Sequence, residues 1–185
     1  MTSALHLDTA TLEAGLDHIR QSPQDVGTIE MIIRRPGVDQ REELEEAEVD
    51  LELGVVGDTW KARESISTPD GSPNPDSQVT IMNARVIDLV AQGRDRWSLA
   101  GDQFYADLDL GRENLPPGTR LQLGSAVVEV SEIPHTGCAK FSGRFGADAL
   151  RFVNTGAGRE LSFRGINTRV VVPGLIRRAD QIKKL

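Results

Sequence analysis

The stretch TRLQLGSAVVEV, residues 119–130, constrains the fold more than any other part of the sequence. Apolar and polar residues alternate on both sides of Gly124-Ser125. This period of two is typical of half-buried strands, and a two-residue connection that contains glycine is typical of a tight hairpin. We therefore predict two antiparallel strands here, with Leu121 and Leu123 facing Val128 and Val130.

Further strand patterns occur before and after this hairpin. They are Thr28–Arg34, the apolar run QVTIM at 78–82, INTRVVVPG at 166–174 and LIRRADQIKKL at 175–185. Many short strands with few and short helices indicate a closed or partly closed barrel. We predict a mainly β, barrel-like domain that spans residues 1–185, with a helical N-terminal extension over about 1–25 and no linker to a second domain.

Three helices are predicted from apolar residues at helical spacing. The first covers 9–20 and is capped by Asp8 or Thr9. The second spans 83–93, with Asn83 as its N-cap. The third covers about 141–153 and places Phe141, Phe145, Ala149 and Phe152 on one stripe. The acidic segment REELEEAEVDLEL at 41–53 favours a solvated helix or loop face.

Composition excludes several classes of protein. The net charge of −7 argues against nucleic-acid binding, which requires a basic surface. No apolar run approaches the roughly 20 residues that cross a bilayer. A single cysteine allows no internal disulfide and favours a reducing compartment. We therefore expect a cytoplasmic protein that neither crosses a membrane nor binds nucleic acid.

The single cysteine, Cys138, lies in HTGCAKFSGRFG at 135–146. A lone cysteine is often a small buried apolar residue. Its neighbours favour a reactive thiol, because His135, Lys140 and Arg144 add positive charge, and a helix that starts near Phe141 directs amides toward the sulfur. Gly137 permits a close approach of the backbone or a positive φ. The residues alone leave both interpretations open.

Other polar residues are weaker candidates. Arg112 and Asn114 in GRENLPPG form a turn or direct a guanidinium and an amide into a pocket, and Asn83 is most simply a helix cap. The three histidines share no metal-ligand spacing with one another or with Cys138. No phosphate-binding P-loop, dinucleotide fingerprint or nucleophile elbow is present.

Five stretches in order resemble the MOSC domain, the module named for the C-terminal part of molybdenum cofactor sulfurases. They are GVVGDTW, DSQVTIMNARVIDLV, GDQFYADLDLGRENLPPGTRLQLGSAVVEV, HTGCAKFSGRFGADALRFVN and RGINTRVVVPGLIRRADQI, which together cover about residues 47 to 185. Cys138 stands at the family's cysteine position. One departure is Gly137, where the family often has proline.

The resemblance implies a β-barrel-like fold and a molybdenum-pterin cofactor or a persulfide on Cys138. It makes Cys138 the metal or sulfur ligand. It places Asn83, Arg112 and Asn114 in motifs near the family's pocket, with His135 and Lys140 as further donors for an anionic phosphate. Three functions follow: a reductase of N-hydroxylated or N-oxide compounds with an electron-donor protein, a sulfur carrier, or a non-catalytic module that binds cofactor or another small molecule.

Overall fold

The computed structural model describes residues 6–65 and 68–185, and its centre is a closed β-barrel. The predicted N-terminal extension is therefore described from residue 6 onward, and its first five residues lie outside the described part. The strands are β1 Val26–Arg34, β2 Glu42–Leu44, β3 Glu46–Asp50, β4 Gly54–Val55, β5 Val79–Asn83, β6 Phe104–Asp107, β7 Arg120–Leu123, β8 Ala126–Pro134, β9 Ile166–Val172, β10 Gly174–Arg177 and β11 Gln181–Lys184.

Seven strands form the barrel in the order β11-β7-β8-β9-β5-β6-β1, and pairing of β1 with β11 closes it. β5 and β6 are parallel, and the other neighbours are antiparallel. β2 extends the sheet beyond β1, and β10, β3 and β4 form a small second sheet. The predicted mainly β barrel is confirmed.

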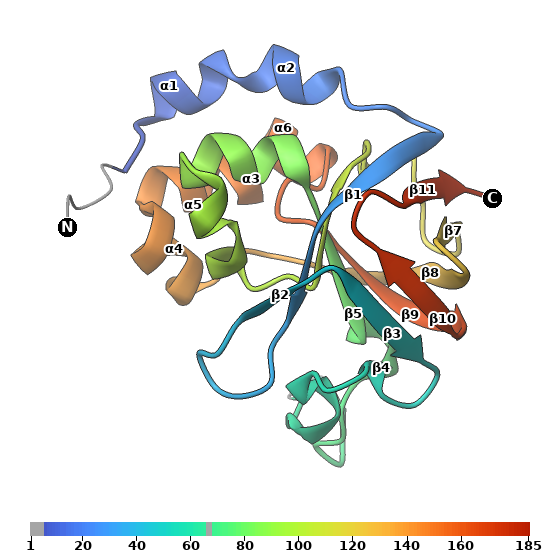
Figure 1. Ribbon diagram of the computed structural model, residues 1–185. Helices are drawn as coiled ribbons and strands as arrows, with labels where there is room; N and C mark the ends of the chain where they lie inside the picture. Colours follow the sequence, from blue (N-terminus) through green and yellow to red (C-terminus); the bar gives the residue numbers. More distant parts are fainter. Residues whose placement is uncertain (1–5, 66–67) are drawn as a thin grey trace.

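Helices cover one side of the barrel (Figure 1). The α-helices are α1 Thr9–Ala14, α2 Leu16–Arg20, α3 Ala84–Ala91, α4 Ala139–Phe145, α5 Ala147–Asn154 and α6 Ala157–Glu160, and the 3₁₀ helices are η1 Thr59–Ala62, η2 Pro75–Ser77 and η3 Arg94–Ala100. None of the helices in the described ranges combines the length and apolar character needed to cross a membrane.

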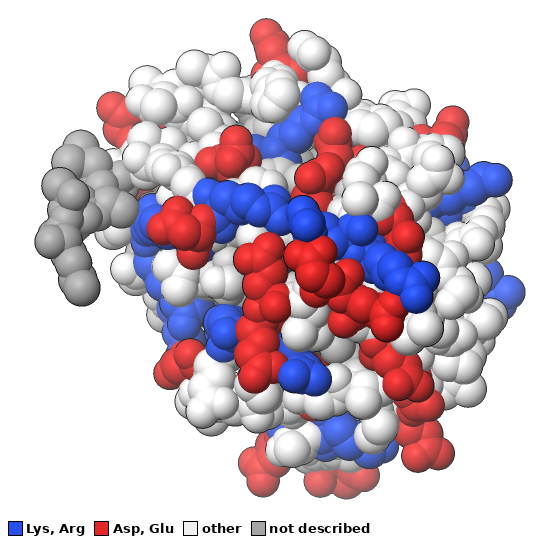
Figure 2. Space-filling view, in the orientation of Figure 1, with Lys and Arg blue, Asp and Glu red and all other residues white. Residues whose placement is uncertain are grey.

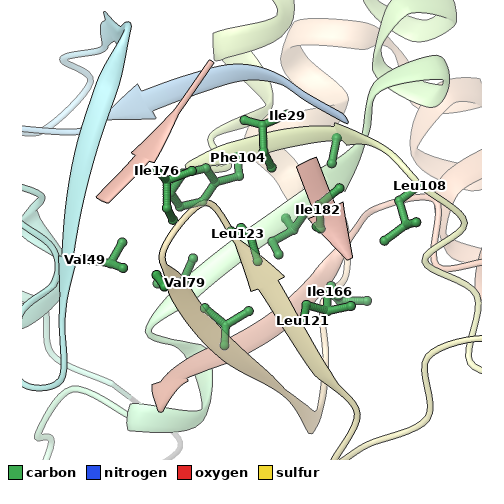
Figure 3. Close-up of a cluster of buried hydrophobic side chains, with 14 of the residues drawn as sticks. Ile29, Val49, Val79, Phe104, Leu108, Leu121, Leu123, Ile166, Ile176 and Ile182 are labelled. Atoms are coloured by element: carbon green, nitrogen blue, oxygen red, sulfur yellow. The ribbon is translucent and has the colours of Figure 1, made fainter. Parts of the chain in front are cut away.

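Two apolar clusters fill the molecule. The first occupies the barrel interior, where Ile29, Phe104, Leu121, Leu123 and Ile182 point toward one another (Figure 3). The second lies between the outer face of β1, β5 and β6 and the helices. All five residues of β5 are buried because this strand is covered on both faces. That explains why apolar residues of β5 occur on both faces of the strand.

The hairpin at 119–130 forms as predicted, with one change in register. Leu123 pairs with Ala126, so Gly124-Ser125 is the two-residue turn, and Gly124 has a φ of +55°. Leu121 faces Val128. Val130 instead donates its amide to the Thr119 carbonyl, 2.9 Å away, so it does not face Leu123.

The acidic segment at 41–53 is a correction, since it contains strands β2 and β3 rather than a helix or a loop alone. Ala47 and Val49 point into the barrel core at a period of two, and the acids between them face outward. Arginines neutralise many of these acids, through the pairs Arg34–Glu42, Arg94–Glu43, Arg178–Glu45 and Arg177–Glu46. Figure 2 shows red and blue side chains interleaved on this face.

Two of the predicted helices are each divided by a glycine. Residues 9–20 form α1 and α2, which meet at Gly15, and Asp8 caps α1 by accepting from the Thr11 amide at 2.8 Å. The predicted helix at 141–153 consists of α4 and α5, which meet at Gly146 with a φ of +100°. A positive φ ends a right-handed helix and suits glycine.

Candidate functional site

Cys138 is the N-cap residue of α4, and its side chain is exposed. The segment before it is fixed to the end of α5 by the side chain of Asn154. The Gly137 amide donates to Asn154 Oδ1 at 2.8 Å, and Asn154 Nδ2 donates to the Gly137 carbonyl at 3.2 Å. This pair of hydrogen bonds presents the thiol at the start of α4 instead of burying it. Cys138 is therefore not a core residue.

Gly137 fits a tightly packed position and does not have a positive φ. A Cβ atom at this position would lie 2.7 Å from Leu150 Cδ1 and 3.3 Å from Val153 Cγ2 on α5. Glycine thus allows the chain to pass close against α5 just before it reaches Cys138. The close approach is made to a helix, and a close approach to a ligand stays a prediction.

The surroundings of the thiol favour its ionised form. Burial alone would raise the pKa of Cys138, but the backbone amides of Phe141 and Lys140 and the charge of Arg164 lower it, and the net pKa lies below the usual value for cysteine. A thiolate, unlike a thiol, is a nucleophile and a metal ligand. The amides at the start of α4 thus lower the pKa of the thiol, as the sequence predicted. Arg164, which the sequence did not predict, adds to this effect.

We expect Cys138 to react with iodoacetamide at a lower pH than an exposed model thiol. Alkylation rates measured against pH give the apparent pKa, which should fall below about 8.5, the unperturbed reference. Lys140→Gln serves as the control. It keeps the backbone amide that acts on the sulfur and removes only the ammonium group, which pairs with Asp39. An apparent pKa at or above the reference value would contradict the described geometry.

Four arginines from three segments of the chain converge on the end of η3, and one of them, Arg164, acts on the Cys138 thiol. Each donates to one of four consecutive carbonyls at the end of η3. The bonds are Arg41 to Ser98 (3.3 Å), Arg144 to Leu99 (2.6 Å), Arg164 to Ala100 (2.9 Å) and Arg35 to Gly101 (2.9 Å). The end of a helix carries partial negative charge and attracts cations. We call these four residues the arginine cluster.

Carboxylates compensate only part of this positive charge. Arg35 pairs with Asp58 at 2.8 Å, and Arg164 pairs with Asp102 at 2.6 Å. Asp39 is shared between Arg144 and Lys140, at 3.3 and 3.4 Å. Arg41 makes no ion pair with any described residue, and its pKa is lowered by burial and by the charges of Arg144 and Arg35. The cluster can therefore accept an anion.

Asp102 and His135 lie next to Arg164 of the arginine cluster. Asp102 is fully buried, and its second oxygen, Oδ1, lies 3.3 Å from Nδ1 of His135. Burial and the charge of Arg164 lower the pKa of His135 to about 3, although Asp102 acts in the opposite direction. His135 is therefore neutral at neutral pH, and it cannot supply the positive charge that its position in the sequence suggested.

The predicted site residues do not all meet at the thiol. Lys140 follows Cys138 on α4 and is exposed. Arg112 and His135 line a cavity of about 430 Å³, and Cys138 is not among the described residues that line it. Arg35, Arg41 and Arg164 were not predicted from the sequence. The first two stand close to the end of β1, but no spacing links them to Cys138.

Asn83 and Asn114 are engaged within the protein. Asn83 is buried and caps α3, and its Nδ2 donates to the Ser22 hydroxyl and the Leu108 carbonyl. Asn114 Nδ2 donates to the carbonyls of Gln24 and Asp109, and its Oδ1 accepts from Lys184. Their predicted role in cofactor binding receives no support from these contacts.

The fold is that of known proteins, although their sequences are distant. No protein-family model matches the chain, and no curated protein matches it either. YuaD from Bacillus subtilis superposes with a TM-score of 0.64 at 15% identity, over 86% of this chain and 95% of that one. YiiM from Escherichia coli gives 0.54 at 18% identity over 85% and 69%, and YiiM from Geobacillus stearothermophilus gives 0.53 at 14% over 88% and 74%. YuaD and YiiM are MOSC-domain proteins, so the likeness supports a MOSC-like fold for this chain.

Proposed function

We propose that the protein binds a molybdenum-pterin cofactor through the thiolate of Cys138. The observation that carries this proposal is an exposed thiol of lowered pKa at a helix start, beside arginines whose charge is only partly compensated. Soft thiolate sulfur suits a polarizable metal. The MOSC-like fold supports the same assignment.

The residues present fit such a group. No set of three or more His, Cys, Asp or Glu side chains in the described ranges is placed to hold a bare metal ion. A metal that is already bound by the pterin needs only one further ligand from the protein, and Cys138 can provide that ligand. Arg41, Arg144 and Lys140 would hold the anionic phosphate, because guanidinium groups bind phosphate through paired hydrogen bonds.

The reaction we propose is reduction of N-hydroxylated or N-oxide compounds. The bound cofactor would supply two-electron redox chemistry. The nitrogen–oxygen bond breaks with uptake of two electrons and two protons, and the oxygen leaves as water. The electrons come from an external electron-donor protein. Within this chain, the exposed position of Cys138 leaves room for a small substrate, and the backbone amides at the start of α4 together with Arg164 lower the pKa of the thiol.

Metal and pterin content tests the proposal directly. The wild type and Cys138→Ser are produced in a host that makes the cofactor, and both are assayed for molybdenum and for pterin. We expect both to be retained by the wild type and lost together from Cys138→Ser, because serine offers a hard and protonated oxygen. Thr136→Ser, a change at an exposed neighbour, is the control and should load like the wild type.

A sulfur carrier is the second candidate, because an exposed thiol of lowered pKa is also what a persulfide requires. Equal and near-zero molybdenum in wild type and Cys138→Ser would overturn the cofactor proposal. Trapping of a persulfide on Cys138 in the same samples would then support the carrier. Cofactor that is retained without redox turnover would indicate a non-catalytic binding module.

A further inference from the structure

The cavity that contains Arg112 is a separate feature of the molecule. The second half of β8, the loop at 112–117, the end of α5, α6 and the segment leading into β9 surround it. Its volume of about 430 Å³ is in the usual range of small-molecule sites. Its lining includes His135 and Thr136 but stops short of Cys138.

One part of the cavity wall is apolar and well supported. Leu115, Val130, Val153 and Ile166 line it, and each of them is buried in the structure. They belong to the loop after β6, to β8, to α5 and to β9, so four parts of the fold fix the shape of the cavity. Such a wall binds the apolar body of a ligand.

Two arginines at the cavity are uncompensated. Arg112 and Arg159 are exposed, and neither guanidinium makes a hydrogen bond or an ion pair within the described ranges. The Arg112 amide donates to the Glu160 carbonyl at 3.2 Å, which holds the 112 loop against α6 beside Arg159. Glu132 is the one carboxylate among the described lining residues, so the arginines outnumber it.

The side-chain amides at the cavity are already in use, and its free donors include the Arg112 and Arg159 guanidinium groups and the Ser131 hydroxyl, which is buried without a hydrogen-bond partner among the described residues. Asn154 holds Gly137 through two hydrogen bonds, and Asn167 Nδ2 donates to the Ile133 carbonyl at 3.1 Å. Arg164 also lines the cavity, but it is buried and bound to Asp102 and to the Ala100 carbonyl. Recognition of a charged group therefore depends on Arg112 and Arg159.

We propose that this cavity is a second binding site, for a small organic anion with an apolar body. Arg112 and Arg159 hold its carboxylate or phosphate, and the apolar wall encloses the rest. Guanidinium groups match both kinds of anion through paired hydrogen bonds. Cys138 is not among the described lining residues, although Thr136 and Asn154 of the lining lie next to the segment that carries the thiol, so the two sites have to be told apart by experiment.

Calorimetric titration with benzoate and with phenyl phosphate tests the site and distinguishes the two anions. We expect the wild type to bind at least one of them, and Arg112→Gln/Arg159→Gln to bind it at least tenfold more weakly. Arg151→Gln is the matched control, since Arg151 is an exposed α5 arginine outside the lining that pairs with Asp148. That variant should bind as the wild type does.

Cys138→Ser separates this proposal from the cofactor proposal, because it should bind the probe with unchanged affinity. Amide shifts on titration of the wild type should include Ile133 and Val153 and spare Lys140. Absence of binding by both probes would overturn the second site. So would equal binding by the double variant, or loss of binding in Cys138→Ser.

Discussion

Phe145→Ala should lower the free energy of unfolding by about 3 to 5 kcal/mol. The Phe145 ring is 1% exposed and belongs to the cluster between the barrel and the helices. Its centroid lies 4.8 Å from that of Phe141, and Arg96 stacks over it at 5.5 Å. Removal of the ring leaves a cavity that these neighbours cannot fill without moving α4. Urea denaturation of both proteins measures the loss.

Phe152→Ala is the matched control on the neighbouring helix. Phe152 is only partly buried, and it packs on Phe163 with the centroids 5.1 Å apart. We expect a smaller loss, because less apolar surface is removed from the interior. Equal midpoints for wild type and Phe145→Ala would show that the α4 ring does not anchor the helix. The position of Cys138 would then need another support.

The barrel could be predicted because its strands carry local patterns. The hairpin has a period of two and the turn residues Gly124-Ser125. The segment at 78–82 is mostly apolar, which is typical of a buried strand. The segment at 41–53 was misassigned because its many acids conceal the alternation of Ala47 and Val49. The predicted helix at 141–153 was too long because its apolar stripe continues through Gly146, whose backbone conformation ends α4.

The sequence predicted only those features of the site that lie within one segment of the chain. Cys138 and Lys140 stand together in the sequence, and both lie at the start of α4. The arginine cluster joins residues from three separate segments, and it depends on the carbonyls of 98–101, which no side-chain pattern reveals. Arg112 was predicted near the pocket through the family resemblance, and it lines the cavity together with His135 and Thr136 of the segment that leads to Cys138.

Asp102→Asn should cost about 3 to 5 kcal/mol of stability, because it leaves the charge of Arg164 buried without its partner. The two side chains are 0% and 8% exposed, and they meet at 2.6 Å. Asparagine keeps the size of the side chain, so the loss reports the charge. Asp39→Asn is the control, since Asp39 is exposed and its pairs with Lys140 and Arg144 are solvated. That change should cost less than about 1 kcal/mol.

A second measurement on Asp102→Asn tests whether this buried pair also sets the chemistry of the thiol. Arg164 lowers the pKa of Cys138, and Asp102 opposes part of that charge. Once Asp102 is neutral, the field of Arg164 at the sulfur increases, so the pH midpoint of Cys138 alkylation should move further down. Under folding conditions, an unchanged midpoint would mean that Arg164 does not act on the thiol. A lower midpoint together with lower stability would show that one buried charge pair supports the fold and restrains the thiolate.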